Sequence, residues 1–458
     1  MIDNSVGESK NSESLYRAVW RWHFYSGLFV TPFILILAIT GLAMMYIGYF
    51  DGRDGEKISI PVPEHMEMMI LEKQSNIVLS KYQGATLIEW IRAPQVDRVN
   101  VFRIKDSNGI QNMIAINPYT GDIVDGWQRR QGWYDLADNI HSDLLIGTTG
   151  DRLLEIAAGF GIVLLISGIY LWYPREKRLS SNQSIFKKIH SSIGIYLGVF
   201  LFLFLLSGMS WTGVWGAKLV QAWSTFPAEK WSNIPLSDKT HASLNHTASE
   251  GMPWALEQTK LPASGSDAGI NGTLAGEKVD IDSIQRLASR LGFESRYRVS
   301  FPKGEQGVWT INQDTMNSDA PNPFSDKTVH IDRYTGKVLA KVTFDDYSIA
   351  GKTMAVSIPL HMGLVSIWNL IINTIICLGF MALSITGIIM WWKRRPKGSR
   401  FKLIAPKEPK HLPHFQSAML LMLMVSLAFP LVGITLVCVL LVDLFVISKI
   451  SFLKKIFY

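Results

Sequence analysis

The sequence predicts an α-helical membrane protein with a pseudo-twofold repeated four-helix transmembrane core, a C-terminal hydrophobic helix and two small α+β domains between the helices. Three observations predict this class. The 458 residues are 48% hydrophobic and only 18% charged, with a mean hydropathy of +0.16. Several apolar runs are each long enough to cross a hydrocarbon core of about 30 Å. The basic residues responsible for the net charge of +7 collect beside these runs, which indicates membrane topology and excludes a nucleic-acid surface.

The apolar runs cover residues 22–50, 144–173, 193–216, 361–392 and 415–448. The first run is longer than the apolar part of a secretory signal and lacks an A-x-A cleavage site, so we expect it to remain as an anchor. The last run is interrupted by Pro430 and Gly433, which permits one kinked crossing or a hairpin of two short legs. A leg of about 15 residues would span only about 22 Å, so a single crossing is favoured.

The orientation follows from the linkers between the runs. Residues 173–190 and 393–411 are rich in Lys and Arg, and such segments stay on the cytoplasmic side. The amino terminus is then inside, and both long loops lie outside the membrane. The predicted division of the chain is 1–50 (tail and first span), 51–140 (first outer domain), 141–216 (second and third spans with their inner loop), 217–357 (second outer domain), 358–397 (fourth span) and 398–458 (inner linker and C-terminal span).

Both outer segments carry the pattern of a β-hairpin. In residues 112–127 and again in 328–344, an alternating apolar strand meets Tyr-Thr-Gly and resumes as a strand, so Gly121 and Gly336 are expected at the turn. Residues 282–293 have apolar side chains at helical spacing and should form a helix that packs on such a sheet.

The hairpins belong to a larger internal repeat. Gly41 follows His23 by 18 residues, and Gly208 follows His190 by the same 18 residues. For the return helices, His141 precedes Gly168 by 27 residues and His361 precedes Gly387 by 26 residues. Each half therefore consists of an outward helix with a histidine at its inner end, an outer domain, and an inward helix with a histidine at its outer end.

The four repeated histidines form two facing pairs in this topology, His23 with His190 near the inner end and His141 with His361 near the outer end. A single histidine at a helix end is commonly an interfacial residue. Four at mirrored positions suit the axial ligation of haem iron, because an imidazole near hydrocarbon is costly unless its nitrogens are used. Both cysteines, Cys377 and Cys438, lie in apolar runs and form no CxxCH site, so haem would be held by coordination and packing.

The other ionisable residues carry weaker signals. We expect the remaining six histidines to be solvated surface residues: His65, His241, His246, His330, His411 and His414. Asp151 and Arg152, at the start of the second span, either pair locally or meet a haem propionate. The sequence has no P-loop and no Gly-rich dinucleotide motif after a strand, so we expect no nucleotide-binding fold.

Several of these segments together resemble one known family. RWHFYSGLF, the PYTG and RYTG hairpins, LHMGLVSIWNLI and the helix ends WYPR and WWKRRP resemble the PepSY-associated transmembrane family of iron-regulated membrane proteins, over about residues 16–397. The resemblance implies a bacterial inner-membrane protein with two periplasmic PepSY domains. Because characterised relatives include a dihaem ferric-siderophore reductase, the resemblance also implies this activity. It implies that His23, His141, His190 and His361 are the haem ligands.

The activity that the resemblance implies is electron transfer from an unknown donor, a quinone or a cytoplasmic reductase, through two b-type haems to a ferric siderophore outside. Reduction would release the iron, because hard oxygen ligands suit Fe(III) better than Fe(II). Two alternatives stay open. One is a haem-free PepSY module that assists a transporter or a peptidase, and the other is a haem relay to quinone or to a protein partner.

Overall fold

The computed structural model describes residues 2–129, 131–173, 184–221, 233–245, 251–320, 322–395, 403, 406 and 423–453. The chain divides into two compact units, each built from separate segments. Unit 1 contains Met1–Leu42, Asn139–Lys218 and Ile372–Tyr458, and unit 2 contains Ala43–Asp138 and Leu219–Ile371. The predicted His246, His411 and His414 lie outside the described residues.

Among the described residues, four helices are long and apolar enough to cross a membrane: Ser14–Phe50, Thr148–Trp172, Ile367–Arg394 and Pro430–Ile447. A fifth candidate is a pair of shorter helices, α5 (Ile185–Tyr196) and α6 (Gly198–Met209), which meet at a bend of 59°. These elements overlap the five predicted apolar runs, of which residues 415–422 lie outside the described residues. The third run differs from the prediction, because its helix is broken at Leu197 and begins before residue 193. The chain is thus a membrane-associated helical protein that also contains a β-rich unit.

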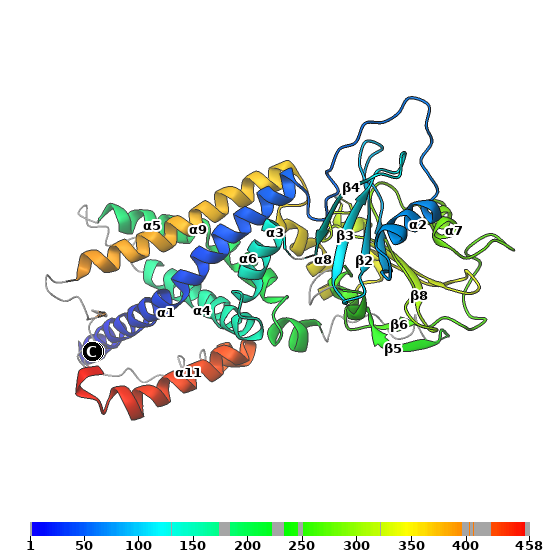
Figure 1. Ribbon diagram of the computed structural model, residues 1–458. Coiled ribbons are helices and arrows are strands. Elements are labelled where there is room, and N and C mark those ends of the chain that lie inside the picture. Colours follow the sequence, from blue (N-terminus) through cyan, green and yellow to red (C-terminus); the bar gives the residue numbers. More distant parts are fainter. Residues whose placement is uncertain are drawn as a thin grey trace. The chain divides into compact units, whose positions relative to one another are not determined.

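Unit 1 is a helical assembly (Figure 1). Its core joins α1 (Ile2–Phe50), α4 (Thr148–Trp172), α6 and α9 (Ile367–Arg394) through apolar side chains such as Ile162, Leu205 and Phe380. The C-terminal α11 (Pro430–Val442) packs on α4, where Val432 lies so close to Gly159 that a Cβ there would clash. Residues 423–428 before it are helical as well, with a break at Phe429. Whether this run crosses once or twice stays a prediction.

The histidines of the return helices lie on separate helices rather than on the spans themselves. His141 belongs to α3 (Trp133–Asp143) and His361 to α8 (Ile349–Met362). Residues 144–147 separate α3 from α4, and Leu145 has a positive φ of 62° there. Gly363 ends α8 in the left-handed conformation, at φ 75°, which suits a residue without a Cβ. The predicted run 361–392 therefore crosses a helix boundary, and its span begins at Ile367.

Unit 2 contains one antiparallel sheet of eight strands in the order β10-β9-β8-β7-β1-β2-β3-β4 (Figure 1). The strands are β1 (Thr86–Ile91), β2 (Asn100–Lys105), β3 (Gln111–Ile116), β4 (Ile123–Gln128), β7 (Arg298–Ser300), β8 (Val308–Gln313), β9 (Lys327–Asp332) and β10 (Val338–Thr343). Strands β5 (Leu236–Thr240) and β6 (Lys260–Pro262) form a separate pair. The two segments predicted as outer domains therefore contribute to a single sheet through the pairing of β1 with β7.

Each half of the sheet follows a helix, and these two helices cover one face. Helix α2 (Leu71–Lys81) precedes β1 and α7 (Ile281–Arg290) precedes β7. Apolar residues of both helices, including Val78 and Ile284, join the main core with those of the strands. The expected hairpins are confirmed as β3–β4 and β9–β10, with φ of 79° at Gly121 and 66° at Gly336. The expected helix 282–293 is confirmed as α7, which begins at a capping box on Asp280.

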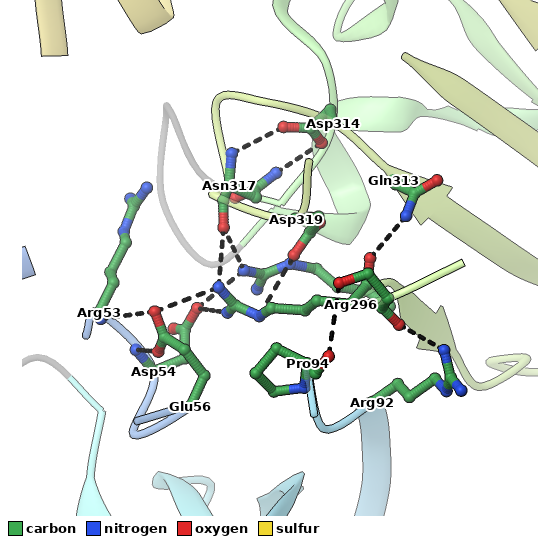
Figure 2. A network of polar contacts seen from close by, with 12 residues as sticks. Arg53, Asp54, Glu56, Arg92, Pro94, Arg296, Gln313, Asp314, Asn317 and Asp319 are labelled. Carbon is green, nitrogen blue, oxygen red and sulfur yellow. Dashed lines mark hydrogen bonds and ion pairs between the residues drawn. The ribbon is translucent and has the colours of Figure 1, made fainter. Parts of the chain in front are cut away.

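A buried ionic network connects the two halves of unit 2 (Figure 2). Asp54 is 1% exposed and pairs with Arg129 at 3.1 Å, with Arg296 at 2.6 Å and with Arg298 at 2.8 Å. Arg298 also pairs with Asp319 at 3.2 Å. Buried charges are tolerated only when they are paired and hydrogen-bonded, so these residues tie the segment after α1 to the strand that begins the second half.

Candidate functional site

The two inner histidines approach each other in unit 1. His23 lies on α1 and His190 on α5, and both side chains are partly buried. Their ring centroids are 6.4 Å apart, and the ring planes are nearly perpendicular at 85°. The structure therefore brings together the two residues that the internal repeat predicted as a pair, although they are far apart in the sequence.

Each ring of this pair is held by a hydroxyl residue that precedes a glycine on the facing helix. Nδ1 of His23 lies 2.9 Å from Oγ of Ser167 on α4, and that hydroxyl donates its own proton to the carbonyl of Leu164 at 3.1 Å. With its proton on the Leu164 carbonyl, the Ser167 hydroxyl is available to accept a hydrogen bond from the Nδ1–H of His23. A Cβ on Gly168 would lie only 3.3 Å from Cε1 of this ring, so the glycine leaves the space that the imidazole occupies.

His190 repeats the same arrangement on α9. Its Nδ1 lies 3.1 Å from the carbonyl of Leu383 and 3.2 Å from Oγ1 of Thr386, whose hydroxyl donates to Ala382 at 2.7 Å. A carbonyl can only accept, so Nδ1 of His190 carries the proton. A Cβ on Gly387 would lie 3.5 Å from Cε1 of the ring, which is an ordinary contact distance.

His141 docks in the same way on the first helix. Its Nδ1 lies 2.9 Å from Oγ1 of Thr40, whose hydroxyl donates to the carbonyl of Ile36 at 2.7 Å. A Cβ on Gly41 would approach Cε1 of the ring to 3.4 Å. The counterpart of this Thr-Gly pair in the second half is Ser207-Gly208. His361 lies in the last turn of α8 in unit 2, so its pairing with His141 stays a prediction.

The carbonyl of Leu383 places the proton of His190 on Nδ1, and the hydroxyls beside His23 and His141, which donate to backbone carbonyls, favour the same tautomer. With the proton on Nδ1, the lone pair of each ring is on Nε2, which is the form that binds a metal ion. Two such nitrogens on opposite sides of one metal, at about 2 Å each, would place the ring centroids roughly 6 Å apart. The separation of 6.4 Å between His23 and His190 agrees with this. The inner pair therefore fits the axial ligation of a haem iron.

No clustered metal site competes with this pair in the part of the chain that the structure describes. There, no group of three or more His, Cys, Asp or Glu side chains is arranged to hold a metal ion. Two imidazoles alone are the ligand set that a haem needs, because the porphyrin supplies the other four nitrogens.

The hydroxyl residues beside the rings were not predicted as part of the site. The sequence marked Gly168 and Gly387 only as landmarks of the repeat, whereas Ser167 and Thr386 hold the rings. The signal that could have found them is the hydroxyl residue directly before each repeated glycine. Distance along the chain concealed the contact, since His23 and Ser167 are separated by 144 positions.

A buried carboxylate in the second span was also missed. Glu155 on α4 is 2% exposed and accepts hydrogen bonds from the backbone N–H groups of Val214 at 3.2 Å and Trp215 at 3.1 Å. These groups open the short π-helix η2 (Trp215–Val220), so Glu155 caps it. One turn earlier, Asp151 pairs with Arg152 and accepts from the N–H of Gly213 at 3.2 Å. The structure thus contains the local ion pair between Asp151 and Arg152, which was one of the two roles expected for them.

Two histidines predicted at the surface are buried in unit 2, so that prediction was wrong. His241 and His330 are both 0% exposed, and their Nε2 atoms lie 2.9 Å apart. Nδ1 of His241 donates to the carbonyl of Thr259 at 2.7 Å, so His330 must donate across the pair from its own Nε2. Burial lowers the pKa of His241 to about 4, which keeps the pair neutral. His65 is exposed, as expected.

The arrangement of apolar helices and β-rich unit agrees with the comparison to known protein families. The sequence profile of the PepSY-associated TM region matches residues 20–394. The chain belongs to this family. The match includes all four repeated histidines and every strand of unit 2, and it confirms the resemblance seen in the sequence. A search of curated proteins finds no match.

Membership of the PepSY-associated family accounts for the coarse architecture. It identifies a membrane protein, in agreement with the long apolar helices α1, α4 and α9. Residues 398–458, including α11, lie beyond the family region. The docking of histidines on hydroxyl-glycine pairs is a property of this chain's own residues and narrows what the protein can do.

Proposed function

We propose that the protein is a bacterial inner-membrane electron carrier with two b-type haems that reduces ferric siderophores on the periplasmic side and releases Fe(II). The observation that carries the proposal is the inner histidine pair, whose ring centroids are 6.4 Å apart and whose hydrogen bonds leave the lone pairs on Nε2. Two imidazoles that face each other inside a helix bundle are costly to bury unless their nitrogens are used.

The internal repeat extends the proposal from one haem to two. His141 has the same hydroxyl-glycine contact as the inner histidines, and His361 holds the matching place in the second half. In this proposal, the helices form a pseudo-twofold four-helix core, with His141 and His361 as the outer ligand pair. The two helix-and-four-strand halves of unit 2 correspond to two PepSY-type domains on the periplasmic side.

Haem iron bound at these histidines would supply a one-electron couple inside the membrane. The protein's own part is to hold each imidazole in one tautomer and one orientation, which Ser167, Thr386 and Thr40 do through Nδ1. A hydrogen bond at Nδ1 makes Nε2 a stronger ligand. With His23 and His190 as the residues that would hold one haem and His141 and His361 those that would hold the other, a ferric chelate would not need to bind at a haem iron. It would rest against the protein surface, so unit 2 would select it by shape.

The test is the visible spectrum of the purified protein, oxidised and reduced with dithionite, with haem quantified per chain. We expect two haems per chain in the wild type. His23→Ala and His190→Ala should each remove one and the same haem, and His141→Ala and His361→Ala the other. His65→Ala, which changes an exposed histidine, should remove none. A colourless protein from cells with ample haem would refute the proposal and favour a haem-free PepSY module.

The substrate is tested separately with the reduced protein under anaerobic conditions. Ferric siderophores of the hydroxamate and catecholate types should reoxidise it, with Fe(II) trapped by a ferrous chelator. A haem-loaded protein that is reoxidised by a quinone and by no ferric siderophore would show that the acceptor differs from the proposed one.

A further inference from the structure

Helix α8 of unit 2 has an apolar face that is exposed. At helical spacing, Ile349, Val356 and Leu360 lie on one side of this helix, and the first and last of them are 87% and 43% exposed. The opposite side carries Gly351 and Ile358, which are both buried. A helix that is apolar all round is usually covered by protein or by membrane, so the exposed face of α8 requires an explanation.

This face forms one wall of an open groove. The groove has a volume of about 470 Å³, which lies within the range of about 300–1,000 Å³ that pockets for small molecules have. The second wall is the short helix η7 (Pro323–Ser325), against which α8 packs. The lining residues include no charged side chain and are Asn322, Pro323, Phe324, Val356, Leu360 and Val365.

The groove presents hydrocarbon to any occupant. The ring of Phe324 is 63% exposed and is held by an edge-to-face contact with Phe344, with the ring centroids 5.1 Å apart. Asn322 supplies the one polar side chain of the lining, and it accepts a hydrogen bond from the backbone N–H of Phe324 at 3.0 Å. A polar ligand would lose its hydration here without gaining an ionic partner, so the lining favours an apolar occupant.

The chain itself sets the depth of the groove relative to the membrane. Residues 363–366 are all that separates α8 from α9, and Trp368 in the first turn of α9 is 70% exposed. A Cβ on Gly363 would lie 3.0 Å from Sδ of Met45, which belongs to the candidate span Ser14–Phe50. Met45 lies about 7 Å before the end of that span, at 1.5 Å per residue.

We propose that this groove binds the acyl chain of a membrane lipid, so that α8 and η7 anchor unit 2 in the bilayer surface. Interfacial helices place their apolar face about 5–10 Å into the boundary between headgroups and acyl chains, and the contact of Gly363 with Met45 lies at such a depth. An exposed Trp at the start of a span is typical of the same level.

The consequence concerns the helix that carries a predicted haem ligand. His361 lies in the last turn of α8, next to the groove residue Leu360, so a lipid seated on this face would hold that turn at a fixed depth. The inference rests on the membrane class of the chain and on the groove, and it does not require the proposed electron transfer.

The experiment measures which quencher reaches the groove in the full-length protein. The polarity-sensitive fluorophore NBD is attached to single cysteines, Phe324→Cys or Val356→Cys, after Cys377→Ala and Cys438→Ala have removed the natural thiols. The protein is placed in phosphatidylcholine nanodiscs with or without a nitroxide on the acyl chains, and iodide serves as the quencher in water. Val96→Cys is the matched control, because Val96 is apolar and 61% exposed but does not line the groove.

Both groove labels should lose about half of their emission or more to the nitroxide lipid, because acyl chains would contact them. They should also emit at a shorter wavelength than the Val96 label and be quenched less by iodide. Groove labels that iodide reaches as easily as the Val96 label, and that the nitroxide lipid does not quench, would overturn the proposal. Protection from both quenchers would overturn it too, since protein would then cover the groove.

Equal quenching of all three labels by the nitroxide lipid would likewise refute a groove-specific lipid contact. Phe324 and Val356 lie on different elements, so either variant decides the matter if the other does not fold. The readout needs no haem. A colourless protein would therefore refute the electron-transfer proposal and leave this result intact.

Discussion

Oγ of Ser167 accepts a hydrogen bond from Nδ1 of His23 at 2.9 Å while giving its own proton to the carbonyl of Leu164. This double use of one hydroxyl orients the imidazole and fixes which nitrogen keeps a lone pair. A hydroxyl that contacts Nδ1 and also donates to a backbone carbonyl orients His190 and His141 as well. The same hydrogen bonding therefore orients three imidazoles for coordination.

Removing this hydroxyl should weaken one haem site selectively. Ser167→Ala deletes the acceptor for Nδ1 of His23, and loss of such a contact typically reduces metal affinity about 10-fold or more. The imidazole also becomes a weaker base, so the potential of the inner haem should rise. Haem titration and a spectroscopic redox titration would measure both effects. Ser191→Ala, whose hydroxyl donates to the carbonyl of Lys188, is the matched control, and equal behaviour of the two variants would contradict the role of Ser167.

The two glycines under the inner rings should differ in their tolerance of a methyl group. A Cβ on Gly168 would lie 3.3 Å from Cε1 of His23, whereas a Cβ on Gly387 would lie 3.5 Å from Cε1 of His190. Gly168→Ala must push the ring by a few tenths of an ångström, so it should lower the inner haem content more than Gly387→Ala does. Gly168→Val should abolish that haem. Haem per chain measures the effect, and the reverse order would contradict the prediction.

Asp54 should be essential for the stability of unit 2. Burial alone would raise its pKa, but the attraction of Arg298, Arg129 and Arg296 outweighs burial and holds the pKa well below its ordinary value. Asp54→Asn leaves buried arginines without their counter-charge, at a cost of about 3–5 kcal/mol. Thermal unfolding would measure this. Asp97→Asn, which breaks a partly exposed pair with Arg98, should cost less than about 1 kcal/mol, and similar losses in the two variants would contradict the prediction.

The sign of the pH dependence at Asp54 follows from its lowered pKa. The group binds fewer protons in the folded than in the unfolded state. Its stabilisation is therefore complete above the ordinary pKa and disappears as the pH falls through the folded value. The wild type should lose this stability in acid, and Asp54→Asn should lack that part of the acid transition.

Glu257 should make unit 2 less stable as the pH rises. Burial raises the pKa of Glu257 to about 7, although hydrogen bonds from Gln221 and Asn245 favour the charged form. The folded state therefore retains a proton that the unfolded state releases, and stability should fall from about pH 4.5 to pH 7, by up to about 3 kcal/mol. Glu257→Gln mimics the protonated acid and should remove this slope. The exposed Glu67→Gln should leave the slope unchanged, and a slope that survives in Glu257→Gln would assign it to another group.

Part of the fold was predictable because its signals are local. The apolar runs specify candidate spans by length alone, and the hairpins of unit 2 follow from alternating strands around Tyr-Thr-Gly, where Gly121 and Gly336 adopt the expected positive φ. The break at Gly363 was missed because apolar runs do not record helix boundaries. A left-handed glycine between two apolar helices leaves the mean hydropathy of the run unchanged.

The burial of His241 and His330 was not predictable from their own neighbourhoods. His241 lies in a polar stretch and His330 at one position of an alternating strand, and the packing of β9 against the η5 segment (His241–Leu244) removes both from water. Two imidazoles can share one buried site because the Nε2 of one donates a hydrogen bond and the Nε2 of the other accepts it. That complementarity exists only after segments 89 residues apart have met.

The sequence by itself determined the membrane class, the internal repeat and the identity of the four candidate ligands, because hydrophobic length and repeated spacing are properties of the chain alone. Tertiary structure decided which groups hold the rings, since Ser167 and Thr386 reach His23 and His190 only when distant helices pack. It also decided that β1 pairs with β7 in a single sheet. Hydrogen bonds between remote segments depend on strand register and on the distances between packed helices, and the order of the residues alone specifies neither.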